Sequence, residues 1–221
     1  MFRATIAYAL MAIEYQAIQT LIESVASPPA LHSALVAKDG AGVLIIGRGE
    51  AGKSTLSCAL WQRGWTLLSD DCCLIESDSG MCTARPAPRR VSLRVPSRAL
   101  LGDALWERIA ATPSCDPTNE GLLFHPDEID GRKRATSVRL AAAVFLGRRD
   151  IALTPATLMR INPAQFLLAL LPYSTLIHRL TPGEAMNRLN PVAATVPAYD
   201  LGRGNLTAMV ERVEGLLGGN D

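Results

Sequence analysis

The chain has very little lysine, although it has an ordinary amount of charge. Among its 221 residues, 22 are Lys or Arg, 21 are Asp or Glu, and the net charge is +1. Lysine occurs only at Lys38, Lys53 and Lys133, so nearly every cation is an arginine. This balance excludes a broad positive surface for nucleic acid and leaves only local basic patches.

Cysteines with metal-ligand spacing are also absent. The five cysteines include no Cys-x-x-Cys pair and no Cys/His ligand spacing, which argues against a structural zinc site. Cys72 and Cys73 are adjacent, so we interpret them as small core residues rather than nucleophiles. An odd number of cysteines without a framework is typical of free thiols, and we therefore expect a cytoplasmic protein.

Long apolar runs are missing as well. No stretch approaches the ~20 apolar residues needed to span a bilayer, so we expect no membrane association. The apolar run over residues 4–13 has the size of a signal-peptide core, but Glu14 interrupts it and no small-x-small cleavage site follows promptly. We interpret residues 4–24 as an amphipathic helix that packs on the domain or on another subunit.

What the sequence does contain is a succession of apolar strands and helices. At 48% apolar and 19% charged residues, the chain fits one globular domain. Strand patterns alternate with helical ones, which favours the α/β class. Residues 83–98 are rich in Pro and Arg and predict an irregular or edge segment, while residues 112–137 predict a long functional or mobile loop. We expect strands at 31–38, 42–46, 65–68, 72–76 and 138–146, and helices at 53–63, 163–171 and 205–217.

The pattern G-x-x-x-x-G-K-[ST] carries the clearest chemistry. Glycines in such a loop let backbone N–H groups point inward around a phosphate, and the following helix adds the positive end of its dipole. Lys53 would contact the β- and γ-phosphates of ATP, and the Ser54 hydroxyl would bind Mg²⁺. The pattern lies between a predicted buried strand and a predicted helix, as this function requires. The residues expected to bind the nucleotide are Gly47, Arg48, Gly49, Glu50, Ala51, Gly52, Lys53, Ser54 and Thr55.

Two adjacent carboxylates follow the strand after that helix. One of Asp70 and Asp71 is well placed to hold Mg²⁺ through water, and the other could accept a proton from a substrate hydroxyl. Consecutive residues of a strand face opposite ways, so the two are expected to have different roles. We assign Asp70, with Ser54, to the metal. Which of the two carboxylates is the base is left open.

These motifs together resemble a known family. Residues 32–71 are similar to the catalytic domain of HPr kinase/phosphorylase. The similarity rests on four motifs: His32-Ser-Ala-Leu-Val, the glycine loop with Lys53-Ser54, Arg63-Gly64 and Leu68-Ser-Asp70-Asp71. The resemblance implies a P-loop in a mixed, twisted sheet like that of phosphoenolpyruvate carboxykinase, flanked by helices. It also implies ATP-dependent phosphorylation of a serine hydroxyl, with His32 near the carboxylates and the transferred phosphate.

The resemblance also sets the expected domain organisation and partners. We expect a helical extension over residues 1–28 and an HPr-kinase-like catalytic domain over residues 29–221. The family's Glu-x-Arg-Gly-x-Gly segment is absent, and arginines occupy its place, so neither the reverse reaction nor HPr itself as substrate is expected. The shorter HPr-kinase-like proteins are the better match, which implies a peptide or small-protein substrate. Because the relatives assemble, a homo-oligomer is among the expected states.

Weaker candidates lie outside these motifs. Arginines near the site could stabilise a transferring phosphoryl group, or they could form a solvated face or a docking patch for an acidic substrate. The acidic residues of the long loop could belong to a lid, although solvated charge is the default interpretation. His125 and His178 have no partner at an informative spacing. These arginines and acids are Arg89, Arg90, Arg94, Arg148, Arg149, Asp127, Glu128 and Asp130.

Two other functions compete with a protein or peptide kinase. One is an ATP-binding regulatory module that hydrolyses slowly and has no acceptor. The other is a kinase for a small metabolite. Transfer of label from γ-labelled ATP, and its dependence on a macromolecule, would separate the three. The sequence does not name the acceptor.

Overall fold

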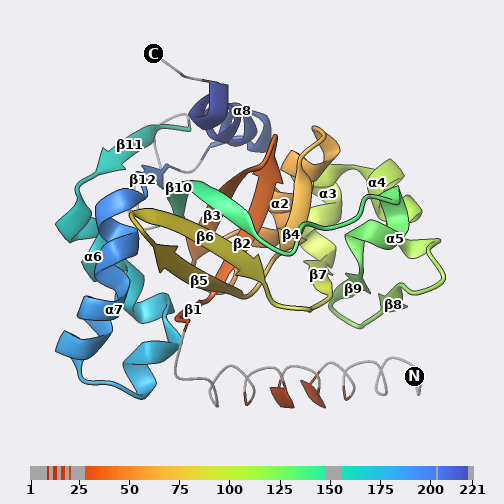
Figure 1. The fold of residues 1–221 in the computed structure, drawn as a ribbon. Coiled ribbons are helices and arrows are strands. Elements are labelled where there is room, and N and C mark those ends of the chain that lie inside the picture. The colour runs from red at the N-terminus through yellow and green to blue at the C-terminus, as the bar shows by residue number, and fades with distance from the viewer. Residues whose placement is uncertain are drawn as a thin grey trace.

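The computed structural model describes residues 28–147, 156–202 and 204–218. It also describes six residues between 9 and 20, all of which are helical. The helix expected over residues 4–24 and the pair Arg148-Arg149 therefore lie largely or wholly outside the described residues. Within the described part of the chain, no helix is long and apolar enough to cross a bilayer. The fold is mixed α/β, with a curled mixed sheet flanked by helices (Figure 1).

The main sheet has nine strands among the described residues. Its path runs β1-β5-β6-β10-β3-β2-β4, and β12 pairs with both β10 and β11. β10 pairs in parallel with β3 and with β12, whereas the β2–β3 pair is antiparallel. Its strands are β1 (Ala30–Leu31), β2 (Ser33–Lys38), β3 (Ala41–Gly47), β4 (Thr66–Ser69), β5 (Cys73–Asp78), β6 (Met81–Pro86), β10 (Val138–Leu146), β11 (Leu158–Ile161) and β12 (Ala198–Leu201).

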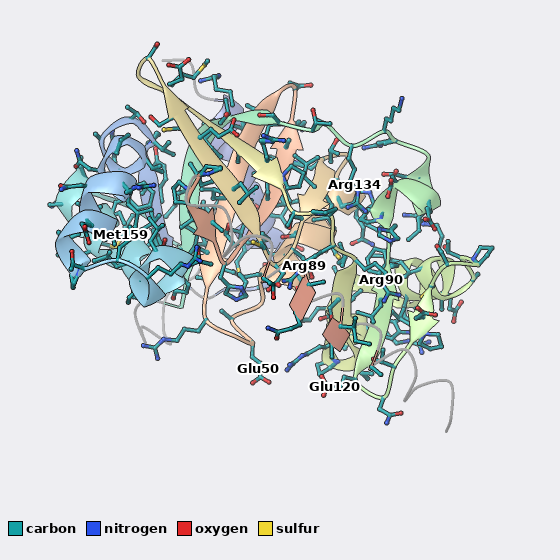
Figure 2. The ribbon with its side chains drawn as sticks, turned by 60° about the horizontal axis from the view of Figure 1, so that its bottom comes forward. Glu50, Arg89, Arg90, Glu120, Arg134 and Met159 are labelled. Carbon is teal, nitrogen blue, oxygen red and sulfur yellow. The ribbon has the colours of Figure 1, made fainter. Side chains whose placement is uncertain are left out.

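A second, smaller sheet lies beside the main one. It consists of β7 (Val91–Arg94), β9 (Gly121–Phe124) and β8 (Asp116–Pro117), all antiparallel, with β9 in the middle. Figure 2, which brings the bottom of Figure 1 forward, shows Glu120 of this unit near Glu50, which follows β3. The two sheets thus meet at the end of β3.

Helices cover the main sheet on both faces. In Figure 1, α6 and α7 lie to one side of the strands, whereas α2, α3 and α4 lie to the other with the second sheet. The helices are α2 (Lys53–Gln62), α3 (Arg98–Leu101), α4 (Asp103–Ala110), α5 (Pro126–Asp130), α6 (Pro163–Leu170), α7 (Pro182–Thr195) and α8 (Leu206–Gly218), with 3-10 turns η1 (Val95–Ser97), η2 (Leu171–Tyr173) and η3 (Thr175–His178).

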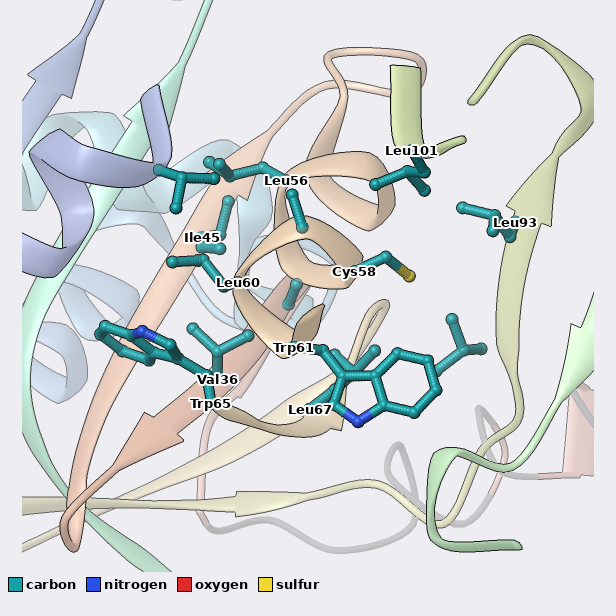
Figure 3. Packing of buried hydrophobic residues seen from close by; sticks show 14 of the residues in the cluster. Val36, Ile45, Leu56, Cys58, Leu60, Trp61, Trp65, Leu67, Leu93 and Leu101 are labelled. Atoms are coloured by element: carbon teal, nitrogen blue, oxygen red, sulfur yellow. The ribbon is translucent and has the colours of Figure 1, made fainter. Parts of the chain in front are cut away.

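Side chains of β3 alternate between two hydrophobic cores. Val43 and Ile45 pack with α2 and α8, whereas Leu44 and Ile46 pack with α6 and α7. All four are fully buried. This explains the continuous apolar run of the strand, because a strand covered on both faces needs no polar positions. Figure 3 shows the first core, in which Trp61 and Leu93 connect α2 with the second sheet.

The structure confirms most of the predicted elements and corrects two. The strands expected over 42–46 and 138–146 lie where the sequence predicts them. The prediction of an irregular or edge segment over 83–98 is wrong in its first part, because β6 pairs with β5 on one side and β10 on the other. The long loop expected over 112–137 is also wrong, because it contains β8, the fully buried β9 and α5.

Candidate functional site

The loop between β3 and α2 forms the centre of the candidate site. β3 ends at Gly47 and α2 begins at Lys53, so the loop leaves the carboxyl end of a strand that has a parallel neighbour, where ligands bind in α/β sheets. Gly52 precedes the helix with φ +96°, a left-handed conformation that glycine adopts without strain. Glu50 also has a positive φ of 65°, so the loop curves tightly above the helix N-terminus.

Lys53 is the buried cation of this loop. Its side chain is only 8% exposed. Its Nζ donates to the carbonyl oxygens of Gly47 (2.9 Å) and Arg48 (3.3 Å) and lies 3.1 Å from Nε2 of His32. Burial lowers the pKa of Lys53, although the negative charges of Asp71 and Asp70 oppose this shift. A lysine has three donors, so all of them are engaged within the site.

Asp70 lies deepest in the site, just after β4. It is 6% exposed, and its Oδ2 accepts hydrogen bonds from the Ser54 hydroxyl (3.2 Å) and the Ser92 backbone N–H (2.9 Å). Burial raises its pKa to about 6, helped by the neighbouring charge of Asp71 and opposed by these hydrogen bonds. Asp70 therefore connects the start of α2 with β7.

Asp71 faces the cavity and has different partners. Its Oδ1 lies 2.9 Å from Nδ1 of His32, and its Oδ2 accepts a hydrogen bond from the buried guanidinium of Arg89. Burial alone would raise the pKa of Asp71, but the hydrogen bond from His32 and the positive charges of Arg89 and Lys53 outweigh it and lower the pKa. The two adjacent carboxylates thus have pKa values shifted in opposite directions.

His32 connects Lys53 with Asp71. It lies in a bend between β1 and β2, and its backbone N–H donates to the Tyr173 carbonyl at 2.7 Å. If the Lys53 ammonium donates to Nε2, the ring is neutral and its proton is on Nδ1, where it donates to Asp71. A charged ring would strengthen the attraction to Asp71 but would leave Lys53 facing a second cation. We favour the neutral ring on that ground.

The loop and the second sheet enclose a cavity of about 850 Å³ between them. His32, Lys53, Asp70 and Asp71 line its main-sheet wall. The opposite wall comes from the segment around β7, with Arg89, Arg90, Ser92, Arg94 and Leu123. Arg94 pairs with Glu50 across the gap and lies 3.8 Å from Glu120 on its own side.

The structure brings together the residues that the motifs singled out, and places the weaker candidates in different surroundings. His32, Lys53, Ser54, Asp70 and Asp71 all line the cavity. Three of the candidate arginines, Arg89, Arg90 and Arg94, line it as well.

The acidic residues considered for a lid, and interpreted by default as solvated charge, instead hold α5 in place. Asp127 pairs with Arg134 at 2.9 Å, Glu128 accepts a hydrogen bond from Ser114, and Asp130 accepts one from the Trp61 indole N–H at 2.6 Å. His125 lies in the same unit, as the N-cap residue of α5, and the side chain of His178 is outside the described part of the structure.

The sequence reasoning missed the contribution of β7. The backbone N–H of Ser92 binds Asp70, which no side-chain motif can reveal. A signal was present, because Val91-Ser-Leu-Arg94 alternates apolar and polar residues as a half-buried strand does. The prolines on either side favoured an irregular segment, so this short alternation did not lead to a predicted strand. Glu120, which reaches the site through Arg94, carries no local signal.

The donor atoms present suit a hard cation that keeps most of its water. No group of three or more His, Cys, Asp or Glu side chains that could hold a metal occurs among the described residues. Ser54 and Asp70 nevertheless offer a hydroxyl and a carboxylate side by side beneath the loop. Mg²⁺ typically takes only one or two protein oxygens and completes its shell with waters and phosphate oxygens. The residues therefore fit Mg²⁺ better than a metal that needs a full protein cage.

Comparisons with known proteins give two similarities. A family model described as "SynChlorMet cassette protein ScmC" matches residues 7–98. The structure of the Hpr(Ser) kinase/phosphatase from Coxiella burnetii aligns with 86% of this chain and 99% of its own, with 14% identity and a TM-score of 0.44. No curated protein matches the sequence. The matched family model differs from the family that the motifs resemble.

Proposed function

We propose that this protein is an ATP-dependent kinase that transfers the γ-phosphate to a hydroxyl, most simply that of serine, in a peptide or small protein. One observation carries the proposal: three groups line the same cavity. They are Lys53 of the glycine loop, Asp70, which is hydrogen-bonded to Ser54, and Asp71, which is held by His32 and Arg89. Phosphoryl transfer needs this set of a phosphate cradle, a metal-holding acid and a proton acceptor.

The loop would bind the triphosphate. Its backbone N–H groups and the N-terminus of α2 favour an anion, and Lys53 adds a full charge. To reach a phosphate, Lys53 must exchange at least one of its present bonds to Gly47, Arg48 and His32. Ser54 and Asp70 would hold Mg²⁺, which neutralises charge that develops on the phosphates when it is bound.

Asp71 is better suited than Asp70 to accept the proton. Asp70 is almost fully buried and occupied by Ser54 and Ser92, whereas the side chain of Asp71 is 29% exposed and faces the cavity. The acceptor oxygen forms a bond to the γ-phosphorus as the bond to the β–γ bridging oxygen breaks. ADP leaves, and the hydroxyl proton passes to Asp71. His32 and Arg89 hold Asp71 in place and limit its rotation.

Catalysis would come mainly from position and charge. In a loose phosphoryl-transfer transition state there is little covalent chemistry for the protein to perform. Arg89 is 8% exposed, so it lies close to the reacting groups without competing bulk water. Together with Lys53 it would stabilise negative charge on the transferred group.

Transfer from γ-labelled ATP to serine-containing peptides tests the proposal. We expect Lys53→Ala to lower transfer by about 10³-fold, because removal of one preorganised charge contact typically costs 10²–10³ or more. Lys38→Ala is the matched control, since Lys38 is 41% exposed and pairs with Glu214 away from the cavity. Equal transfer by the two variants would contradict the proposal. ATP hydrolysis without any labelled acceptor would favour the regulatory module instead, and labelled small molecules would favour a metabolite kinase.

A further inference from the structure

β7 is an edge strand that borders the proposed reaction site. Within the described chain it pairs only with β9, so its other edge has no strand partner. That edge lies against the cavity, because the Ser92 N–H on this edge donates to Asp70, which lines the cavity. An edge strand offers a row of backbone donors and acceptors to any extended chain that comes alongside.

The hydrogen bonds of β7 show which backbone groups face the cavity. The Val95 N–H donates to the Glu120 carbonyl, toward β9, whereas the Ser92 N–H donates to Asp70, away from β9. In an antiparallel pair, successive residues turn their N–H and C=O groups to opposite sides. The Ser92 C=O and the Arg94 N–H therefore both point to the cavity side, two residues apart.

This spacing matches the pattern of a parallel strand. In a parallel pair, one residue donates its N–H to a carbonyl of the neighbouring strand and accepts from the N–H two residues further on. A residue lying opposite Leu93 could thus bond to the Ser92 C=O and the Arg94 N–H at once. The C=O of Arg94 is less available, since Arg94 is the N-cap residue of η1.

We propose that the acceptor is an extended peptide segment that adds to β7 as a parallel strand, held by these two backbone groups. This inference rests on the proposed kinase function and names how its substrate binds. Neighbouring strands lie about 4.8 Å apart. A segment at that distance from Ser92 brings its residues beside Asp70, whose Oδ2 is 2.9 Å from the Ser92 nitrogen, in the cavity that Asp71 also lines.

The surroundings of β7 favour a peptide over a small metabolite. Val95 is 52% exposed and Leu100 is 63% exposed, so apolar side chains lie beside the strand and, at Leu100, on the cavity wall. A polar metabolite would gain nothing from them, whereas a peptide could cover them with its own side chains. Backbone pairing gives affinity in such strand addition, and the flanking side chains give selectivity.

The Arg94 N–H can be removed with a matched control. Arg94→Pro deletes this donor, and the φ of −75° at Arg94 already suits proline. Arg94→Ala keeps the donor but loses the same guanidinium, including its pairs with Glu50 and Glu120. The comparison between the two variants therefore isolates one backbone group.

The probe is a library of eight-residue peptides with one fixed serine, assayed with γ-labelled ATP. We expect the KM for the best peptide to be about 3- to 10-fold higher in Arg94→Pro than in Arg94→Ala, as expected for one hydrogen bond, with equal KM for ATP. Equal peptide KM values would overturn the proposal. A higher KM for ATP instead would assign this end of the cavity to the nucleoside. If wild type transfers label to free serine but to no peptide, strand addition is wrong while the kinase function stands.

A second measurement uses the unchanged protein, in case Arg94→Pro fails to fold. Each backbone nitrogen of the best peptide is methylated in turn, which removes one N–H and keeps every side chain. Parallel addition predicts that one position raises KM by about 3- to 10-fold or more and that the adjacent positions have a smaller effect. A uniform response along the peptide would overturn the proposal.

Discussion

The two walls of the cavity differ in how firmly their side chains are held. On the main-sheet wall, Lys53 and Asp70 are less than a tenth exposed, and each has at least two hydrogen-bond partners. On the β7 wall, Arg89 is buried against Asp71, but Arg94 is 52% exposed and Glu120 is 66% exposed, and these two meet in a surface ion pair. Surface pairs of this kind typically contribute less than 1 kcal/mol.

This difference separates two tasks that the proposed kinase must perform. Chemistry requires groups fixed within a fraction of an ångström, which burial and multiple hydrogen bonds provide. Recognition of a macromolecule tolerates mobile side chains, because the backbone of the edge strand is what is fixed. We therefore expect changes on the main-sheet wall, and at Arg89, which bonds to Asp71, to alter the rate of transfer, and changes along β7 to alter the use of the acceptor.

Asp71→Asn is expected to have the largest effect on transfer, and it changes only the main-sheet wall. Loss of the proton acceptor should lower kcat for transfer by about 10²–10⁴-fold, with the affinity for ATP little changed. Steady-state kinetics and a separate ATP-binding titration measure the two quantities. Asp103→Asn is the control, because Asp103 also pairs with an arginine, Arg98, but is exposed and outside the cavity. A normal kcat in Asp71→Asn would remove Asp71 from the mechanism.

Gly121→Ala is expected to disturb the structure of the β7 wall alone. A Cβ at Gly121 would lie 2.0 Å from the Leu93 carbonyl oxygen and 2.8 Å from the Arg94 Cα, so β7 and β9 must separate. We expect a loss of about 1–3 kcal/mol in the free energy of unfolding by urea, with peptide transfer impaired and ATP binding retained.

The control for that variant is Gly215→Ala in α8, where a Cβ meets no atom within 4 Å. This substitution should leave transfer unchanged and stabilise the helix by up to ~1 kcal/mol. Should Gly121→Ala weaken ATP binding as much as peptide transfer, the two walls would not be separable.

The smallest expected effect is the pH dependence that the two carboxylates give to the free energy of unfolding. Burial raises the pKa of Asp70 from 3.8 to about 6, so the folded protein keeps a proton that the unfolded chain releases between these values. Stability from this group is therefore lost as the pH rises through that window. The free energy of unfolding of wild type relative to Asp70→Asn should fall by about 1–2 kcal/mol between pH 5 and 7.5.

Asp71 should behave in the opposite way. Its pKa is lowered in the fold, so its contribution to stability is present above 3.8 and is lost as the pH falls below that value. Asp71→Asn should thus destabilise the protein at neutral pH while Asp70→Asn does not. Urea unfolding at several pH values gives both results. The same sign for both variants would contradict the opposite pKa shifts.

The main-sheet wall could be predicted from the sequence because its residues lie close together in the chain. The span from His32 to Asp71 contains a hairpin, the glycine loop, a helix and a strand, and each has a local signal in its turn residues or periodicity. Burial of the apolar run 42–46 on both faces of the sheet follows from the same pattern. The partition of roles between Asp70 and Asp71 needed the structure, because it depends on Ser92 and Arg89.

The β7 wall could not be predicted because long-range pairing forms it. β7 is four residues long, and its partner β9 begins 27 residues after it ends. The prolines on either side of β7 favoured an irregular segment, and the buried residues of β9 lie inside a polar stretch. Tertiary pairing overrode these local signals, as it often does for short strands. The polar residues of α5 likewise proved to be structural ties rather than a lid.

The cavity has a consequence for how fast its ligands arrive. Its walls carry four Lys or Arg side chains (Lys53, Arg89, Arg90 and Arg94) and four Asp or Glu side chains (Glu50, Asp70, Asp71 and Glu120). A balanced lining projects almost no field beyond its own rim, so it does not draw a polyphosphate from a distance. Association should then proceed at the rate set by unguided diffusion and docking, nearly independent of ionic strength. Under the proposed function, the polyphosphate is attracted only at contact, when Lys53 exchanges its internal hydrogen bonds for bonds to the anion.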